Sequence, residues 1–164
     1  MRSSFLICLL ITMTQACSSL KITGPKVTNC PSDGTCDTEI FENQRFELKR
    51  DQFGKSYLET TENEGARQLK ISFYKNGEES IADSQYIEEI YLPLDRIESQ
   101  INLSKDHFEI NVLYGRIGNF RGEDLYHIKK NVVARVRKQN GNTYISIMLN
   151  QPELAMNQLT LALY

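Results

Sequence analysis

The chain has 164 residues, of which 40% are hydrophobic and 24% are charged, and its formal net charge is −2. This composition is typical of one folded domain and excludes an intrinsically disordered chain. A near-neutral chain without a concentrated basic excess is also not a generic nucleic-acid binder, so no nucleic-acid partner is predicted.

The N-terminus has the order of a secretory signal peptide. Arg2 and the free amino group supply positive charge, residues 5–11 form an apolar run, and residues 14–16 end in small side chains. We predict that residues 1–16 are removed on export. Beyond this leader no apolar run approaches the roughly 18 to 20 residues that span a bilayer.

Cys17 follows Ala16 directly, and this junction resembles the lipobox of bacterial lipoproteins, in which the cysteine is acylated and becomes the first mature residue. Ordinary signal-peptidase cleavage after Ala16 is the alternative. Cysteine counting favours lipidation, because Cys8 leaves with the leader and pairing of Cys30 with Cys36 leaves one exported thiol. More than one fatty-acid chain, such as palmitate, would make the attachment effectively permanent.

Pro31, Asp33 and Gly34 favour a tight turn between Cys30 and Cys36. Such a turn can bring the two Cα atoms to the ~5.5 Å that a disulfide requires. The C-x5-C spacing differs from redox C-x-x-C motifs, and no nearby cysteine or histidine cluster completes a zinc site. A calcium site is a further alternative, although an EF-hand pattern is missing, and no metal is predicted. Its oxygen donors would be Asn29, Asp33, Asp37 and Glu39.

Residues 17–28 are expected to form a lipid-anchored tether whose end can add an edge strand, and residues 29–164 to form a single β domain. Within that domain apolar and polar residues alternate as in half-buried strands. Pro93 suggests that its strand ends at a sheet edge. The alternating runs fall at residues 40–48, 57–61, 69–73, 86–94, 108–114, 132–136, 145–149 and 159–163.

Asn140-Gly141 predicts a two-residue type I′ hairpin turn, which matches the twist of paired strands. The resulting register opposes apolar residues on one face and polar residues on the other. A two-residue turn at Asn76-Gly77 would not oppose apolar residues in this way, so a longer loop is expected over residues 75–83. The apolar pairs expected beside the Asn140-Gly141 turn are Val136–Ile145, Ala134–Ile147 and Val132–Leu149.

About eight short strands separated by turn signals predict an all-β domain. An antiparallel β-sandwich is favoured, because short strands close a barrel poorly, and a partly open β-barrel is the alternative. Helical periodicity is weak throughout, so at most short helical turns are expected near residues 96–100 or 152–156.

The segment 115–122 has the most unusual local composition, with three glycines and two arginines. Backbone N–H groups around Gly118, together with Arg116 and Arg121, could bind an anion or a carboxylate-bearing ligand. A bulged connection between two strands is the alternative reading.

No catalytic residue and no cofactor is predicted. Glu88 and Glu89 are adjacent on a strand and point to opposite faces, so they cannot flank one bond. Glu88 shares the parity of apolar residues, which indicates an ion pair with a neighbouring strand, an edge position near water, or a functional acid. His107 and His127 have carboxylate neighbours in the sequence, but the chain contains no Gly-x-Ser-x-Gly elbow.

The lipobox, the turn at residues 29–36, the run 86–91 and the segment 115–122 together resemble small lipoproteins of Bacteroidetes that have no assigned activity. In such lipoproteins an acidic run after the cysteine marks surface export, and here the first acid after Cys17 is Asp33. The resemblance therefore implies an outer-membrane lipoprotein that faces the periplasm.

Three functions are compared. The leading one is a membrane-anchored, non-enzymatic lipoprotein that binds a protein or a small anionic ligand. An envelope hydrolase with scattered carboxylates and a histidine is the second. A secreted eukaryotic protein is the third, in which residues 102–104 would be an N-glycosylation triplet.

Overall fold

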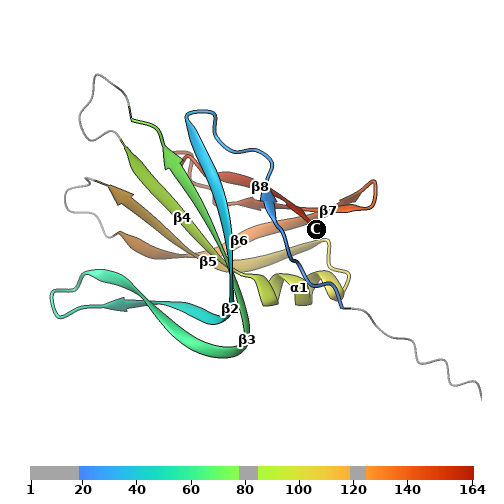
Figure 1. Ribbon diagram of the computed structural model, residues 1–164, viewed down its shortest axis with the longest axis horizontal. Coiled ribbons are helices and arrows are strands. Elements are labelled where there is room, and N and C mark those ends of the chain that lie inside the picture. Colours follow the sequence, from blue (N-terminus) through green and yellow to red (C-terminus); the bar gives the residue numbers. More distant parts are fainter. Residues whose placement is uncertain (1–18, 78–84, 119–124) are drawn as a thin grey trace, which may run out of the picture.

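The computed structural model describes residues 19–77, 85–118 and 125–164 (Figure 1). In these residues eight strands form one antiparallel sheet in the order β1-β8-β7-β6-β5-β4-β3-β2. The elements are β1 (Lys26–Val27), β2 (Gly34–Arg50), β3 (Ser56–Lys75), β4 (Tyr86–Pro93), α1 (Leu94–Asn102), β5 (His107–Gly118), β6 (Tyr126–Gln139), β7 (Asn142–Met148) and β8 (Gln158–Leu163).

The prediction of an all-β antiparallel domain is confirmed. From β2 to β8 every strand pairs with its neighbour in the chain, and β1 is added beside β8. The sheet curls until its two ends approach each other, where the Thr38 hydroxyl donates a hydrogen bond to the Pro25 carbonyl at 2.9 Å. The sheet is not closed. It is the continuous sheet expected of an open barrel, and its two halves face one core as in a sandwich.

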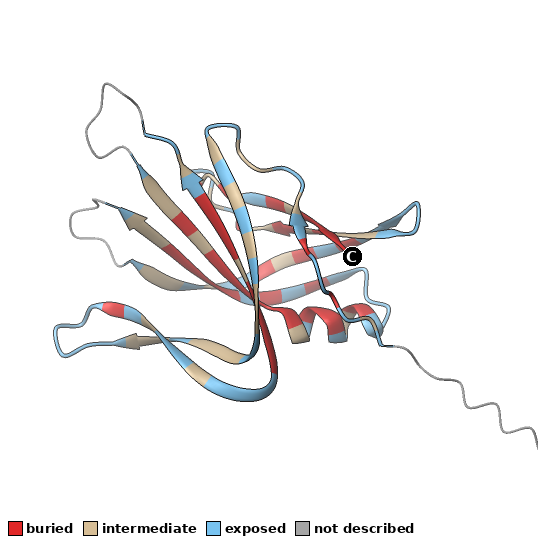
Figure 2. Ribbon diagram, in the orientation of Figure 1, coloured by how far each residue is buried: buried red, intermediate tan, exposed pale blue. Residues whose placement is uncertain are grey.

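Alternate residues of nearly every strand point into this core, which Figure 2 shows as buried bands on the strands. Burying one large apolar side chain contributes roughly 1.5–3 kcal/mol, so this packing is the main stabilising contribution. Fully or almost fully buried members include Leu69, Ile71, Phe73, Ile90, Leu92, Val112, Ala134, Ile145, Ile147, Leu159 and Leu161.

The hairpin predicted at Asn140-Gly141 is confirmed. Both residues have positive φ, 50° and 78°, as a type I′ turn requires. Val136 pairs with Ile145 and Ala134 with Ile147, in the expected register. Local turn chemistry and the alternation of apolar residues therefore specify the same pairing.

Strands β2 and β3 are longer than predicted. The runs 57–61 and 69–73, expected as separate strands, belong to the single 20-residue strand β3. The polar stretch between them does not end the strand, because the pairing with β2 shifts register after Glu42 and continues. Asn43 and Gly65 have positive φ at this bulge, and the Asn43 Oδ1 atom accepts a hydrogen bond from the Gly65 N–H at 3.0 Å. The hairpin bends here, and its outer part, residues 44–62, is called the arm.

The prediction that Pro93 marks a sheet edge is wrong. Strand β4 lies between β3 and β5, and Pro93 is its last residue and the N-cap of α1. The fixed φ of proline suits a helix start, so a strand-to-helix switch explains the residue. Helix α1 contains the helical turn expected near residues 96–100 and buries Leu94, Ile97 and Ile101. Residues 152–156 form turns.

The N-terminal part of the described chain packs on the domain. Ile22 is fully buried in the core, and the Thr23 N–H donates to the Tyr164 carbonyl at 3.1 Å. Strand β1 then pairs with β8. The signal peptide and Cys17 lie outside the described residues. In the described part of the chain, no helix is long and apolar enough to cross a membrane.

Candidate functional site

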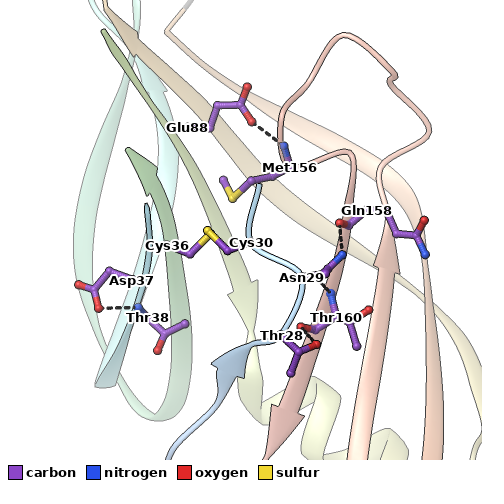
Figure 3. Close-up of a disulfide and its surroundings, with 10 residues drawn as sticks. All are labelled: Thr28, Asn29, Cys30, Cys36, Asp37, Thr38, Glu88, Met156, Gln158 and Thr160. Atoms are coloured by element: carbon purple, nitrogen blue, oxygen red, sulfur yellow. Dashed lines mark hydrogen bonds between the residues drawn. A yellow bond between two sulfur atoms is a disulfide. The ribbon is translucent and has the colours of Figure 1, made fainter. Parts of the chain in front are cut away.

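The predicted disulfide is present. Cys30 and Cys36 are bonded, with their Cα atoms 5.8 Å apart, and the bond joins the segment after β1 to the start of β2 (Figure 3). Their separation of six residues closes a short loop. A loop of this length contributes about 2 kcal/mol by the chain-entropy model.

The oxygens considered for calcium bind protein groups instead. The Asn29 amide bridges to the backbone of β8 through two hydrogen bonds. Asp33 and Glu39 pair with lysines of β3 at 3.5 and 2.8 Å, and Asp37 accepts the N–H of the next residue. In the described ranges no three histidine, cysteine or acidic side chains form a metal-ligating group.

Glu88 is a buried structural carboxylate. It is fully buried on the inner face of β4, and its Oε1 and Oε2 atoms accept the N–H groups of Ala155 at 3.1 Å and Met156 at 3.0 Å. Figure 3 shows it beside Met156. The carboxylate therefore holds the connection between β7 and β8 against the sheet. Sequence reasoning considered an ion pair, an edge position or a functional acid for Glu88, and did not anticipate backbone partners.

Arg116, proposed as a ligand-binding residue, lies on β5 directly opposite Glu88. Its guanidinium carbon lies 4.3 Å from the centre of the Tyr86 ring. Burial, followed by the charge of Glu88, raises the pKa of Tyr114, while the charge of Arg116 opposes this shift. Arg116 is therefore part of a polar cluster on the inner face.

The other members of the predicted anion site are not brought together in the described residues. Gly118 is the last residue of β5 and pairs with Tyr86. Arg121 lies outside the described ranges. The two-arginine site therefore stays a prediction.

Glu89 lies on the outer face, so the two adjacent glutamates point to opposite sides as predicted. Its Oε2 atom accepts hydrogen bonds from the Tyr91 hydroxyl at 3.0 Å and the Tyr126 hydroxyl at 3.1 Å. Burial, followed by the charge of Glu89, raises the pKa of both tyrosines. The two tyrosine hydroxyls therefore keep their protons and donate them to one oxygen of Glu89.

The histidines lie on neighbouring strands. His107 is the exposed first residue of β5, whereas His127 is half-buried on β6, with its ring 5.0 Å from that of Tyr114. His127 therefore belongs to the inner-face cluster, while His107 faces solvent.

Sequence analysis missed a groove beneath the arm. Because the bulge bends the β2–β3 hairpin, the arm lies beside the outer face of the sheet and encloses about 410 Å³. This volume lies within the range of small-molecule sites. The ring of Phe46 packs 4.6 Å from that of Tyr91, which joins the arm to the sheet. Most of the lining residues are apolar or aromatic, namely Phe46, Leu48, Tyr91, Pro93, Val112, Leu113 and Ile128.

Charged residues surround this apolar lining. Arg45 from the arm pairs with Asp95 of α1 at 2.5 Å and ties the arm to the helix. Arg96, which is exposed, lines both the groove and an adjoining hollow of about 430 Å³. Arg96 therefore places a guanidinium beside an apolar surface. The groove can accommodate a molecule that has both an apolar body and a negative group.

Comparison of the chain with protein-family models, with curated proteins and with solved structures found no match. The functional argument therefore rests on the geometry of this chain.

Proposed function

We propose that this chain is a periplasm-facing outer-membrane lipoprotein, anchored through Cys17, whose domain binds a ligand in the groove beneath the arm without catalysing a reaction. The leader and the cysteine count support the anchor. The Cys30–Cys36 bond uses two of the three cysteines expected in the mature chain, so acylation accounts for the third.

The groove is the observation that carries the binding function. It combines the ring of Phe46 on the arm with a floor on the sheet formed by Tyr91, Leu113 and Ile128. Arg96 lies at its edge and favours an anionic group. The preferred ligand is therefore an amphipathic anion, with its apolar body on the floor and its acidic group toward Arg96.

Binding is favoured over hydrolysis for two reasons. Both carboxylate oxygens of Glu88 accept backbone N–H groups, so this residue is committed to holding the β7–β8 connection. Among the described residues that line the groove, Glu47 is the single carboxylate, and neither histidine nor cysteine occurs. Glu47 therefore has no second carboxylate and no histidine among these lining residues with which to form a general acid–base pair.

The mature native protein should begin at Cys17 and carry fatty-acid mass on that residue, as measured by mass spectrometry of the membrane fraction. A Cys17→Ser variant should leave that fraction almost completely, because the acyl chains supply its affinity for the bilayer. A native N-terminus without fatty acid would contradict the anchor. A glycan on Asn102 would indicate the secreted eukaryotic alternative.

An Ile128→Glu variant should bind 1-anilinonaphthalene-8-sulfonate at least about tenfold more weakly than the unchanged protein, which corresponds to roughly 1.4 kcal/mol. This probe has an apolar body and one negative charge, and the new carboxylate would repel it from the floor. Fluorescence titration of the folded protein measures the affinity.

Ile128 is 50% exposed, so the substitution should leave the fold intact. Tyr74→Glu is the matched control, since Tyr74 is 42% exposed and does not line the groove. Equal weakening by both substitutions would place the probe elsewhere.

A further inference from the structure

The N-terminal segment is fixed to the domain from Leu20 onward. The Leu20 N–H donates to the Asn102 Oδ1 atom at 2.9 Å, and the Ile22 N–H donates to the Glu98 Oε1 atom at 2.6 Å. Both acceptors belong to α1, and Ile22 itself is fully buried. The chain therefore meets the domain at the C-terminal end of this helix.

Only Ser18 and Ser19 separate Leu20 from Cys17. An extended chain spans at most about 3.5 Å per residue, so these three steps reach roughly 10 Å. If the acyl groups of Cys17 enter the bilayer, Leu20 must lie close to its surface. This step depends on the lipid anchor of the proposed function.

The surface around this point has the chemistry of a bilayer contact. Leu103, the residue after α1, is 64% exposed and lines one hollow with Ser19 and Leu20. Lys138, from the end of β6, lines a second hollow with the same two residues. We call this surface the Leu103 face; it comprises Leu20, Lys21, Asn102, Leu103, Ser104, Lys105 and Lys138.

The charge of the Leu103 face suits anionic headgroups. Lys105 and Lys138 are both exposed, and Lys21 lies 3.8 Å from the Glu42 carboxylate, which offsets part of its charge. Asp106, the residue directly after Lys105, is also exposed and offsets part of the Lys105 charge. An exposed leucine among lysines can enter the headgroup region while the ammonium groups contact phosphates.

We infer that the Leu103 face lies against the membrane and that Leu103 enters the headgroup layer of a bilayer containing anionic phospholipid. The turn at the tip of the arm, residues 51–55, lies at the left of Figure 1, whereas the N-terminal segment enters the domain at the right. The arm therefore projects away from the bilayer.

Tryptophan fluorescence tests this orientation, because the chain contains no tryptophan and each variant carries one reporter. Leu103→Trp and Phe53→Trp are prepared in the acylated full-length protein. They are reconstituted in vesicles of phosphatidylethanolamine and phosphatidylglycerol with brominated acyl chains. Emission of Leu103→Trp should be quenched several-fold and shifted to the blue, whereas emission of Phe53→Trp should be unchanged.

The two proposals fail in different ways. An acylated Leu103→Trp protein without quenching, or equal quenching of both variants, overturns the orientation alone. A product without acyl mass overturns the lipid anchor, and the orientation with it. Insertion of about ten Gly and Ser residues between Ser18 and Ser19 should abolish the quenching, because such a linker reaches roughly 16–19 Å further. Persistent quenching in that protein would contradict the short connection as its cause.

Discussion

Glu98→Ala should lower the free energy of unfolding by about 3–5 kcal/mol, as expected when one partner of a buried ion pair is removed. Glu98 and Arg67 are both buried and form a salt bridge between α1 and β3. Arg67 also donates to the Ile22 carbonyl at 2.7 Å, so one cluster joins helix, sheet and N-terminal segment. Chemical denaturation followed by circular dichroism measures the loss.

The acidic partners of Arg67 stabilise its buried positive charge. Burial lowers the pKa of Arg67, but hydrogen bonds to Glu98 and Glu42 outweigh burial and raise it. Glu42 lies 3.0 Å from Arg67 and should remain its acidic partner in the variant. The Glu98 change should nevertheless leave the Ile22 N–H without its acceptor. Limited proteolysis should then cut near Lys21 and Lys26.

Glu59→Gln is the control for this prediction. Glu59 lies 3.6 Å from Lys49, and both side chains are substantially exposed. An exposed pair of this kind contributes about 0–1 kcal/mol. If Glu98→Ala were no more damaging than Glu59→Gln, the buried cluster would not stabilise the N-terminal segment.

Glu88→Gln should cost about 2–3 kcal/mol of stability although it changes the side-chain shape very little. A hydrogen bond to a charged group contributes roughly 1.5–3 kcal/mol, and Glu88 accepts two. The new amide offers one oxygen and one NH₂ group, so one backbone N–H would face a donor. Amide hydrogen exchange at Ala155 and Met156 should accelerate, because these two N–H groups donate the hydrogen bonds to Glu88.

Binding of the anionic fluorescent probe should be unchanged in the Glu88→Gln variant, because Glu88 lies on the inner face and the groove on the outer face. Glu89→Gln is the adjacent control, and it should leave exchange at Met156 unaffected, since Glu89 contacts Tyr91 and Tyr126 instead. Unchanged stability and exchange in Glu88→Gln would contradict the structural role and reopen the hydrolase alternative.

The features predicted correctly from sequence depend on residues that are close along the chain. The β6–β7 hairpin follows from Asn140-Gly141 and the alternation on either side of it. The disulfide follows from turn-forming residues between Cys30 and Cys36. The opposite orientation of Glu88 and Glu89 follows from strand geometry alone.

The wrong predictions arose where a local signal has two structural meanings. The alternating runs 57–61 and 69–73 are separated by polar residues and predict two strands, but in the fold they are one strand with a bulge, where the Gly65 N–H donates to the Asn43 side chain, 22 residues away. Pro93 is compatible with an edge strand and with a helix start. In the fold, β4 lies between β3 and β5 and is not an edge strand, and the buried face of α1 stabilises the helix that begins after Pro93.

Patterns along the chain are sufficient to predict an all-β, disulfide-bonded domain, because alternation and turns are properties of short segments. The groove and the buried cluster arise only in the folded molecule. Glu98 contacts Arg67 across 31 residues and Ile22 across 76, and the arm reaches the outer face only after the hairpin bends. Such contacts depend on how distant strands are placed, and residue type alone does not specify them.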